Sequence, residues 1–127
     1  MLPRLISSLT NPAIHGPGVD RVEVIETHIS YVLLTGPYAY KIRKAVNLEF
    51  LDFTTLAARR FDSEEELRLN RPLAPSIYLG VVAITGTVDA PAIDGDGPVL
   101  EYAVKMRQFP QEALLSHLLS EGRLTPA

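Results

Sequence analysis

The sequence predicts an α+β domain in which a five-stranded antiparallel sheet packs against one main helix. Runs rich in β-branched and aromatic residues lie in 22–46 and return at 78–85 and 99–108, with turn residues between them. Between these two groups, residues 54–71 form the best helix candidate, and Pro72 follows where a regular helix should end. Three strands, a helix and two strands therefore define the expected fold.

The first 21 residues are expected to be a helix and a loop that precede the sheet. Residues 3–9 place Leu5, Ile6 and Leu9 on one side of a short helix. The following loop at 11–18 contains two prolines and two glycines.

The first three strands are expected to form an antiparallel meander. They span 22–27, 31–35 and 38–46, with 27–30 as the first connection and Gly36-Pro37 as the second turn. We assign 22–109 to one lobe that contains the whole sheet.

The remaining elements follow from capping and turn residues. Thr54 is the expected N-cap of the main helix, and the loop at 86–98 is rich in glycine, proline and aspartate. Pro110 begins a stripe of leucines, and Thr125-Pro126-Ala127 has the pattern of a further helix start. We therefore expect 110–127 to be a helix and the truncated start of the next, and the chain to be a fragment.

Composition excludes several classes of protein. With 127 residues and 46% hydrophobic residues, the chain is one domain, or a piece of one, with a real core. The net charge of −3 argues against a nucleic-acid partner, and the absence of cysteine excludes disulfides and thiolate zinc sites. No apolar run is long enough for a bilayer and no signal-peptide pattern is present, so we expect a cytoplasmic protein without a membrane partner.

Lys41 is the first candidate for chemistry. On the third expected strand, Ala39 and Lys41 face one side of the sheet while the residues between and beside them face the other. A small residue two positions before a lysine leaves room for a flat base, and the ammonium group then reaches phosphates, as on the third strand of a kinase. The alternative is a solvated basic face that Lys41 shares with Arg43 and Lys44.

The partner expected for Lys41 lies in the glutamate run of the main helix. Leu69 and Leu73 define an apolar direction, and Glu65 and Glu66 both lie within roughly 60° of it. Glu66 lies closer, so we prefer it to Glu65. The alternative is that these glutamates are surface acids on an exposed helix.

In a kinase-like fold, the last of these strands leads to the hinge, whose backbone groups contact the adenine ring. Met106 would line the base pocket, and the backbone groups of Arg107 and Phe109 would face the adenine edge. An ordinary strand that ends at Pro110 is the alternative.

Other motifs carry no chemistry. The three histidines lack metal-ligand spacing, and Asp94-Gly95-Asp96-Gly97 lacks the full calcium ligand series, so we expect a turn there and no metal site in this chain. No P-loop, dinucleotide fingerprint or serine-hydrolase motif is present.

Six runs together resemble the start of the aminoglycoside-phosphotransferase-like bacterial proteins, which often carry a second, P-loop ATP-binding half. The resemblance spans about 22–123. The runs are ETHISYVLLTG at 26–36, YAYKIRK at 38–44, NLEFLDF at 47–53, EEELRLNR at 64–71, LAPSIYLGV at 73–81 and EYAVKMRQF at 101–109.

The resemblance implies a protein-kinase-like N-terminal lobe. Lys41 would contact the phosphates of ATP, Glu66 or Glu65 would hold it, and the hairpin at 27–30, with Ser30, would cover the phosphates without the glycines of protein kinases. The catalytic aspartate, the Mg²⁺ ligands and the acceptor pocket would lie in a C-terminal lobe outside this chain.

The expected function is therefore that of the ATP-binding lobe of a phosphotransferase acting on a hydroxyl of a small molecule. The chain alone should be inactive, because positioning and charge stabilisation need both lobes. A surface left exposed towards the C-terminal lobe would be available for dimerisation. The alternatives are a non-catalytic module that binds nucleotide or a partner, and an interaction domain without a nucleotide site.

Overall fold

The computed structural model describes residues 3–47 and 52–108, which form a mixed α+β fold. One antiparallel sheet of six strands has the order β1-β2-β3-β6-β4-β5. The elements are α1 (Arg4–Leu9), η1 (Pro12–His15), β1 (Glu23–Glu26), β2 (Ser30–Leu34), β3 (Tyr38–Arg43), α2 (Leu56–Asn70), β4 (Tyr78–Gly86), β5 (Pro91–Ile93) and β6 (Val99–Arg107).

The expectation of five strands is wrong by one, because β5 lies inside the segment predicted to be a loop. Its three residues pair with the end of β4, with Ile84 opposite Ile93 and Gly86 opposite Pro91. β5 lies at the edge of the sheet, where a proline is tolerated because its missing N–H breaks no central ladder. A strand this short, with Asp89 shortly before it and Asp94-Gly95 directly after it, has the composition of a loop.

Several element boundaries also differ from the expectation. The N-cap of α2 is Thr55, whose side chain accepts a hydrogen bond from Ala58 N at 3.1 Å, whereas Thr54 bonds to Asp52 instead. β3 ends at Arg43 rather than at residue 46. The end of α2 at Asn70, just before Pro72, agrees with the expectation. The predicted helix at 110–127 lies outside the described residues.

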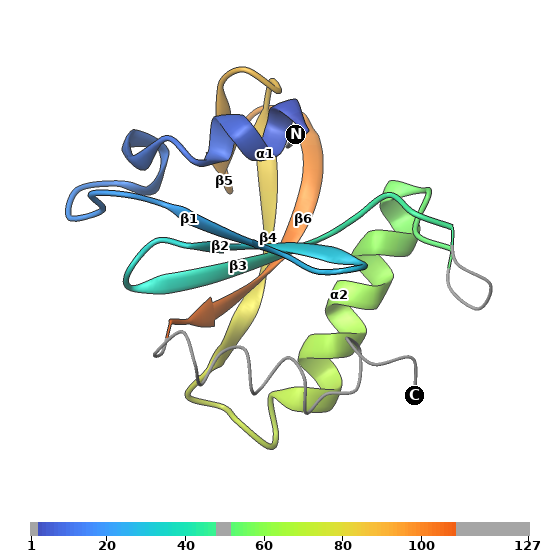
Figure 1. Cartoon of the computed structure of the whole chain (residues 1–127). Helices are drawn as coiled ribbons and strands as arrows, with labels where there is room; N and C mark the ends of the chain where they lie inside the picture. Colours follow the sequence, from blue (N-terminus) through green and yellow to red (C-terminus); the bar gives the residue numbers. More distant parts are fainter. Residues whose placement is uncertain (1–2, 48–51, 109–127) are drawn as a thin grey trace.

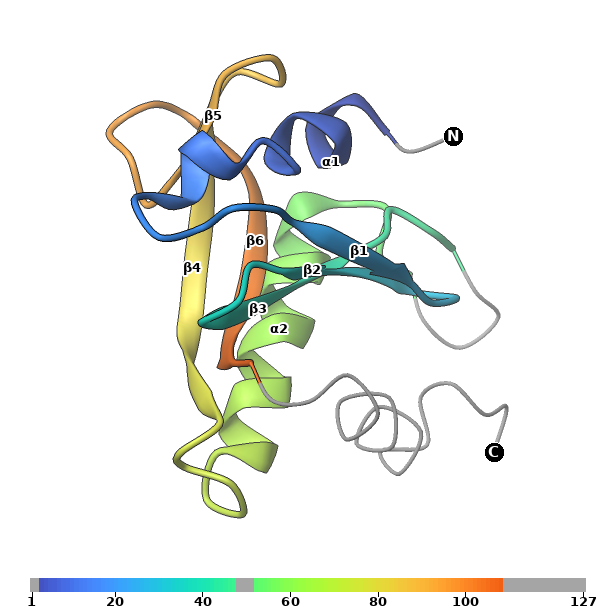
Figure 2. The ribbon, with the colours of Figure 1, turned by 60° about the vertical axis from the view of Figure 1, so that its left-hand side comes forward.

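The sheet is covered on both faces (Figure 1). α1 lies on one side of β1–β3, and α2 lies on the other. The face towards α1 carries Leu33, Tyr40 and Ile42, which pack with Ile6 and Leu9 of the helix. Figure 2 shows α2 running alongside β4 and β6, which cross the direction of β1–β3 steeply, so the sheet is strongly twisted.

α2 turns a polar side towards the sheet. Its buried residues are Arg59, Ser63 and Glu66, at the i, i+4, i+7 spacing of one helical face. Leu69 is 58% exposed and Leu73 is 84% exposed, so the apolar direction inferred from these two leucines is wrong. The hydrophobic pattern fails here because the buried Arg59 and Glu66 meet charged partners on the sheet, while Leu67 beside them is the residue of α2 that packs against the apolar core.

None of the helices in residues 3–47 and 52–108 has the length and the apolar character needed to cross a membrane.

The hairpin between β4 and β5 depends on a glycine. Gly86 has φ +99°, and a Cβ added there would lie 2.7 Å from the carbonyl oxygen of Ala90. We expect Gly86→Ala to lower the free energy of unfolding by about 1–3 kcal/mol, because both the backbone and the contact are strained. The measurement is urea unfolding followed by circular dichroism.

Gly80 is the matched control for this prediction. It lies on the same strand, its φ is not in the left-handed region, and a Cβ there would meet nothing within 4 Å. Gly80→Ala should therefore change stability by less than about 1 kcal/mol. Equal losses in the two variants would contradict the role assigned to Gly86.

Candidate functional site

A buried ion pair joins the centre of β3 to α2. Lys41 Nζ donates to Glu66 Oε2 at 3.1 Å, and both side chains are 1% exposed. The structure therefore places Glu66, and not Glu65, beside Lys41. Glu65 instead receives two hydrogen bonds from Arg68 at the surface.

Arg43 extends this pair into a network, which we call the β3–α2 cluster: Lys41, Arg43, Asp62 and Glu66. The second carboxylate oxygen of Glu66 accepts a hydrogen bond from Arg43 Nη2. Arg43 Nε donates to Asp62 Oδ2 at 2.6 Å. Because Lys41 and Arg43 are buried, the interpretation of these residues as a solvated basic face is wrong.

The cluster follows from the periodicity of its two elements. Lys41 and Arg43 are two residues apart on β3, so both side chains leave the same face of the sheet. Asp62 and Glu66 are four residues apart on α2, so their carboxylates lie one turn apart on the same side of the helix. Two cations on a strand thus meet two anions on a helix.

The electrostatics of Arg43 show how the cluster tolerates burial. Burial disfavours the charged guanidinium, but the carboxylates of Glu66 and Asp62 outweigh it and raise the pKa of Arg43. Arg43 therefore stays charged. Its Nη1 is buried and has no hydrogen-bond partner among the described groups.

A second ion pair holds the first turns of α2. Arg59 Nε lies 3.0 Å from both carboxylate oxygens of Glu101 on β6, and Arg59 Nη1 donates to Phe53 O at 2.7 Å. Burial raises the pKa of Glu101, and the hydrogen bond from Arg59 opposes that shift without cancelling it. With the β3–α2 cluster, this pair brings three cations and three anions to the interface between sheet and helix.

Apolar side chains surround Lys41 on its face of the sheet. Ala39 pairs with Met106 of β6 and with Leu34 of β2, and Val32 pairs with Lys41. The four apolar residues are buried in one cluster. The structure therefore brings together three residues expected at a nucleotide site, namely Ala39, Lys41 and Met106.

Ser30, expected near the phosphates, pairs with Arg43 rather than with Lys41, and it is fully buried. Its hydroxyl is hydrogen-bonded to Thr27 Oγ1 at 2.8 Å, and Thr27 Oγ1 also accepts from Ser30 N. These contacts close the hairpin between β1 and β2, so they explain the turn without a ligand.

The expected adenine-reading segment is described only in part. Arg107 is exposed at the end of β6, where its Nε donates to Ser76 O at 3.2 Å and its backbone N–H donates to Ile77 O. Phe109 lies outside the described residues.

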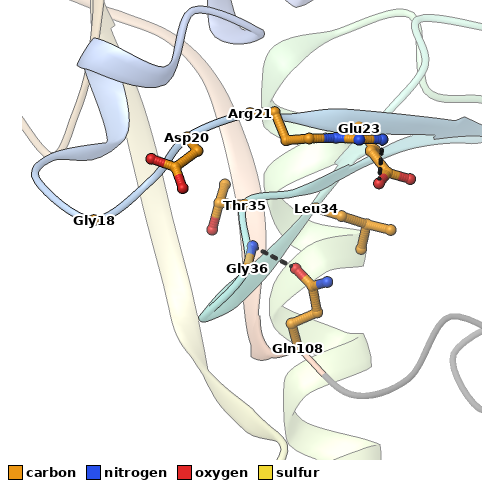
Figure 3. Close-up of a pocket in the computed structure, with 8 residues that line it drawn as sticks. All are labelled: Gly18, Asp20, Arg21, Glu23, Leu34, Thr35, Gly36 and Gln108. Atoms are coloured by element: carbon orange, nitrogen blue, oxygen red, sulfur yellow. Dashed lines mark hydrogen bonds and ion pairs between the residues drawn. The ribbon is translucent and has the colours of Figure 1, made fainter.

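Sequence reasoning missed a polar pocket of about 310 Å³ beside the β2–β3 turn (Figure 3). Gly36 N donates to Gln108 Oε1 at 2.7 Å across it, and Arg21 pairs with Glu23 at 2.8 Å on another side. Leu34, next to Ala39, forms part of its wall. The pocket therefore borders the apolar residues of the candidate site but does not contain Lys41.

Within the part of the chain that the structure describes, no group of three or more histidine, aspartate or glutamate side chains is placed to hold a metal ion.

The chain is similar to proteins that have no assigned function. It is 32% identical over 101 residues to an uncharacterized protein of Mycobacterium tuberculosis, and equally to one of Mycobacterium bovis. The match covers 80% of this chain but 19% of each relative, so the chain spans about a fifth of the length of the curated relatives it matches. No family model matches the chain. No solved structure matches it either.

Two neighbouring glutamates test the importance of the β3–α2 cluster. Glu66→Gln should lower the free energy of unfolding by about 3 kcal/mol, because it removes a buried charge that faces two buried cations. Glu65→Gln is the control, with an expected change below about 1 kcal/mol, because Glu65 takes part in a surface pair. Urea unfolding of both variants measures the difference, and similar losses would show that burial of Glu66 has little energetic weight.

The raised pKa of Glu101 predicts a pH dependence of stability. Between the ordinary pKa of 4.5 and the higher value in the fold, the folded chain binds more protons at Glu101 than the unfolded chain does. The contribution of Glu101 to stability is therefore present below pH 4.5 and is lost as the pH rises through that window. The difference in unfolding free energy between the wild type and Glu101→Gln, measured across the window, should show this slope. A slope of opposite sign would mean that Arg59 lowers the pKa of Glu101.

Proposed function

We propose that this chain is the nucleotide-binding, protein-kinase-like N-terminal lobe of an aminoglycoside-phosphotransferase-like enzyme. The enzyme would transfer the γ-phosphoryl group of ATP to a hydroxyl of a small molecule. The observation that carries the proposal is the buried pair between Lys41 on β3 and Glu66 on α2. A lysine on a strand, held by a glutamate on the adjacent helix, is the arrangement that orients nucleotide phosphates in kinases.

The neighbours of Lys41 suit a nucleotide. Ala39 is small and lies opposite Met106, so the sheet next to Lys41 is apolar. Both side chains are fully buried, so in this proposal a purine reaches them only after the side chains that cover them move. Lys41 would contact the phosphates and Glu66 would set its position. In this proposal the backbone of Arg107 and of Phe109 would face the adenine edge.

The remaining catalytic groups would come from outside this chain. Mg²⁺ would be held by the nucleotide phosphates and by residues of a second lobe, which would also supply the base and the acceptor pocket. A chain spanning about a fifth of its relatives is compatible with such a division. The 127-residue chain alone is therefore expected to transfer no phosphoryl group, and a cytoplasmic location, where ATP is available, belongs to the same proposal.

A non-catalytic module that binds nucleotide or a partner is the second candidate. Phe61 and Leu69 are exposed on the outside of α2, and Leu73 is exposed just after it. Large exposed apolar side chains can form the contact surface for a partner where they lie close together. This observation favours a partner on the outer side of α2, and such a module would bind ATP without transferring phosphate.

Removal of the Lys41 charge tests the proposal directly. In the full-length protein, Lys41→Met should weaken the binding of Mg-ATP about tenfold or more, because a charge-assisted contact to phosphate is lost. Isothermal titration calorimetry measures this affinity. Lys44→Met is the matched control, since Lys44 forms an ion pair with Glu26 near the surface, and it should bind ATP like the wild type.

The outcomes separate the candidate functions. Equal ATP affinity in the wild type and Lys41→Met would refute the assigned role of Lys41. ATP binding without phosphate transfer to any hydroxyl acceptor would favour the regulatory module. If the wild-type protein binds no ATP, the remaining alternative is an interaction domain without a nucleotide site.

A further inference from the structure

Glu66 forms ion pairs with two buried cations at the same time. One carboxylate oxygen accepts from Lys41 and the other accepts from Arg43. Arg43 is 2% exposed, so its interaction with Glu66 is shielded from water and from salt. The proposed function assigns a role, contact with the nucleotide phosphates, only to Lys41 of these two cations. The presence of Arg43 therefore needs its own explanation.

Arg43 also connects Glu66 to a second point on the helix. Its Nε binds Asp62 and its Nη2 binds Glu66, so one planar guanidinium holds two carboxylates that lie one turn apart on α2. Two contacts one turn apart resist both rotation and sliding of the helix. A lysine ammonium group is a single point and lacks this forked geometry.

The charges explain why a second cation is useful at this place. A nucleotide phosphate would compete with Glu66 for the ammonium group of Lys41. If Lys41 were the sole partner, its movement towards phosphate would leave a buried carboxylate without compensation, which is strongly unfavourable. With Arg43 in place, Glu66 keeps a hydrogen-bonded cation whether Lys41 faces the helix or the nucleotide.

We propose that Arg43 is a positioning residue that holds Glu66 and α2 in place while Lys41 shifts its ammonium group towards the phosphates of a bound nucleotide. This inference rests on the proposed function and deepens it. Arg43 does not touch the nucleotide. It acts through Glu66, and Asp62 fixes its orientation.

The orphan Nη1 of Arg43 agrees with a positioning role. A buried donor without a partner reduces stability, and buried ion pairs can be replaced by apolar residues without loss of stability. A requirement for stability alone would therefore be met by apolar residues in place of the whole network, and not by an apolar side chain at position 43 alone, which would leave Glu66 and Asp62 without this partner. The arginine supplies what an apolar side chain cannot, which is a lasting counter-charge for Glu66.

Amide hydrogen exchange of α2 in the full-length protein, with and without Mg-ATP, tests the inference. In the wild type, ATP should leave the exchange of residues 59–67 unchanged, because Arg43 keeps Glu66 compensated. In Arg43→Met, ATP should speed this exchange about tenfold, and ATP affinity should fall about tenfold. Arg43→Lys, which keeps the charge but loses the fork, should give an intermediate effect. Lys44→Met is the control and should behave like the wild type.

The results distinguish the inference from a purely structural role. If Arg43→Met speeds exchange equally with and without ATP, Arg43 only stabilises the fold and the inference is overturned. If the wild type binds ATP and Arg43→Met matches it in both measurements, the inference fails while the proposed function stands. If the wild type binds no ATP, both fall.

Should Arg43→Met fail to fold, Asp62→Asn provides the same test. Asp62 is partly exposed, so this change is mild, yet it removes the contact that orients Arg43. An ATP-dependent rise in α2 exchange in Asp62→Asn would support the inference, and its absence would overturn it.

Discussion

The packing of α2 on the sheet depends on buried charges that must remain paired. Lys41 and Arg43 point from β3 towards the helix, where they form ion pairs with Glu66 and Asp62. An uncompensated charge at such depth is costly, so the helix has little freedom to rotate or to slide. The apolar core of the sheet contributes burial, whereas the ion pairs determine which side of α2 faces inwards.

This constraint explains why α2 has its apolar residues in unusual places. A helix on a sheet ordinarily buries a stripe of leucine and valine and exposes its charges. Here Arg59, Ser63 and Glu66 are buried while Phe61 and Leu69 face outwards. The side of α2 that faces the sheet is therefore unusually rich in charged side chains. The outer side of the helix carries apolar side chains that could contact another protein surface.

The candidate site joins features that differ in how readily they could be predicted. Alternation along the strand placed Ala39 and Lys41 on one face, and the structure confirms that placement. Arg43 and Asp62 were missed as members of the cluster, although their spacings, two from Lys41 and four from Glu66, already put them on the same faces. The pocket beside Gly36 had no such signal, because a turn, the segment before β1 and the end of β6 meet there from distant parts of the chain.

The sequence by itself determined the α+β class, the central strands, the end of α2 shortly before Pro72 and the facing of Lys41, because each follows from local periodicity or from proline geometry. Tertiary structure alone decided that Glu66 rather than Glu65 meets Lys41, and that Leu69 is exposed although it lies about 60° from Glu66 around the helix. It also decided that 91–93 pair with β4 as an edge strand. The physical reason is the same in each case. The partner that satisfies a charge or a backbone group lies far away in the chain, so the local sequence around the residue does not reveal which partner it will contact.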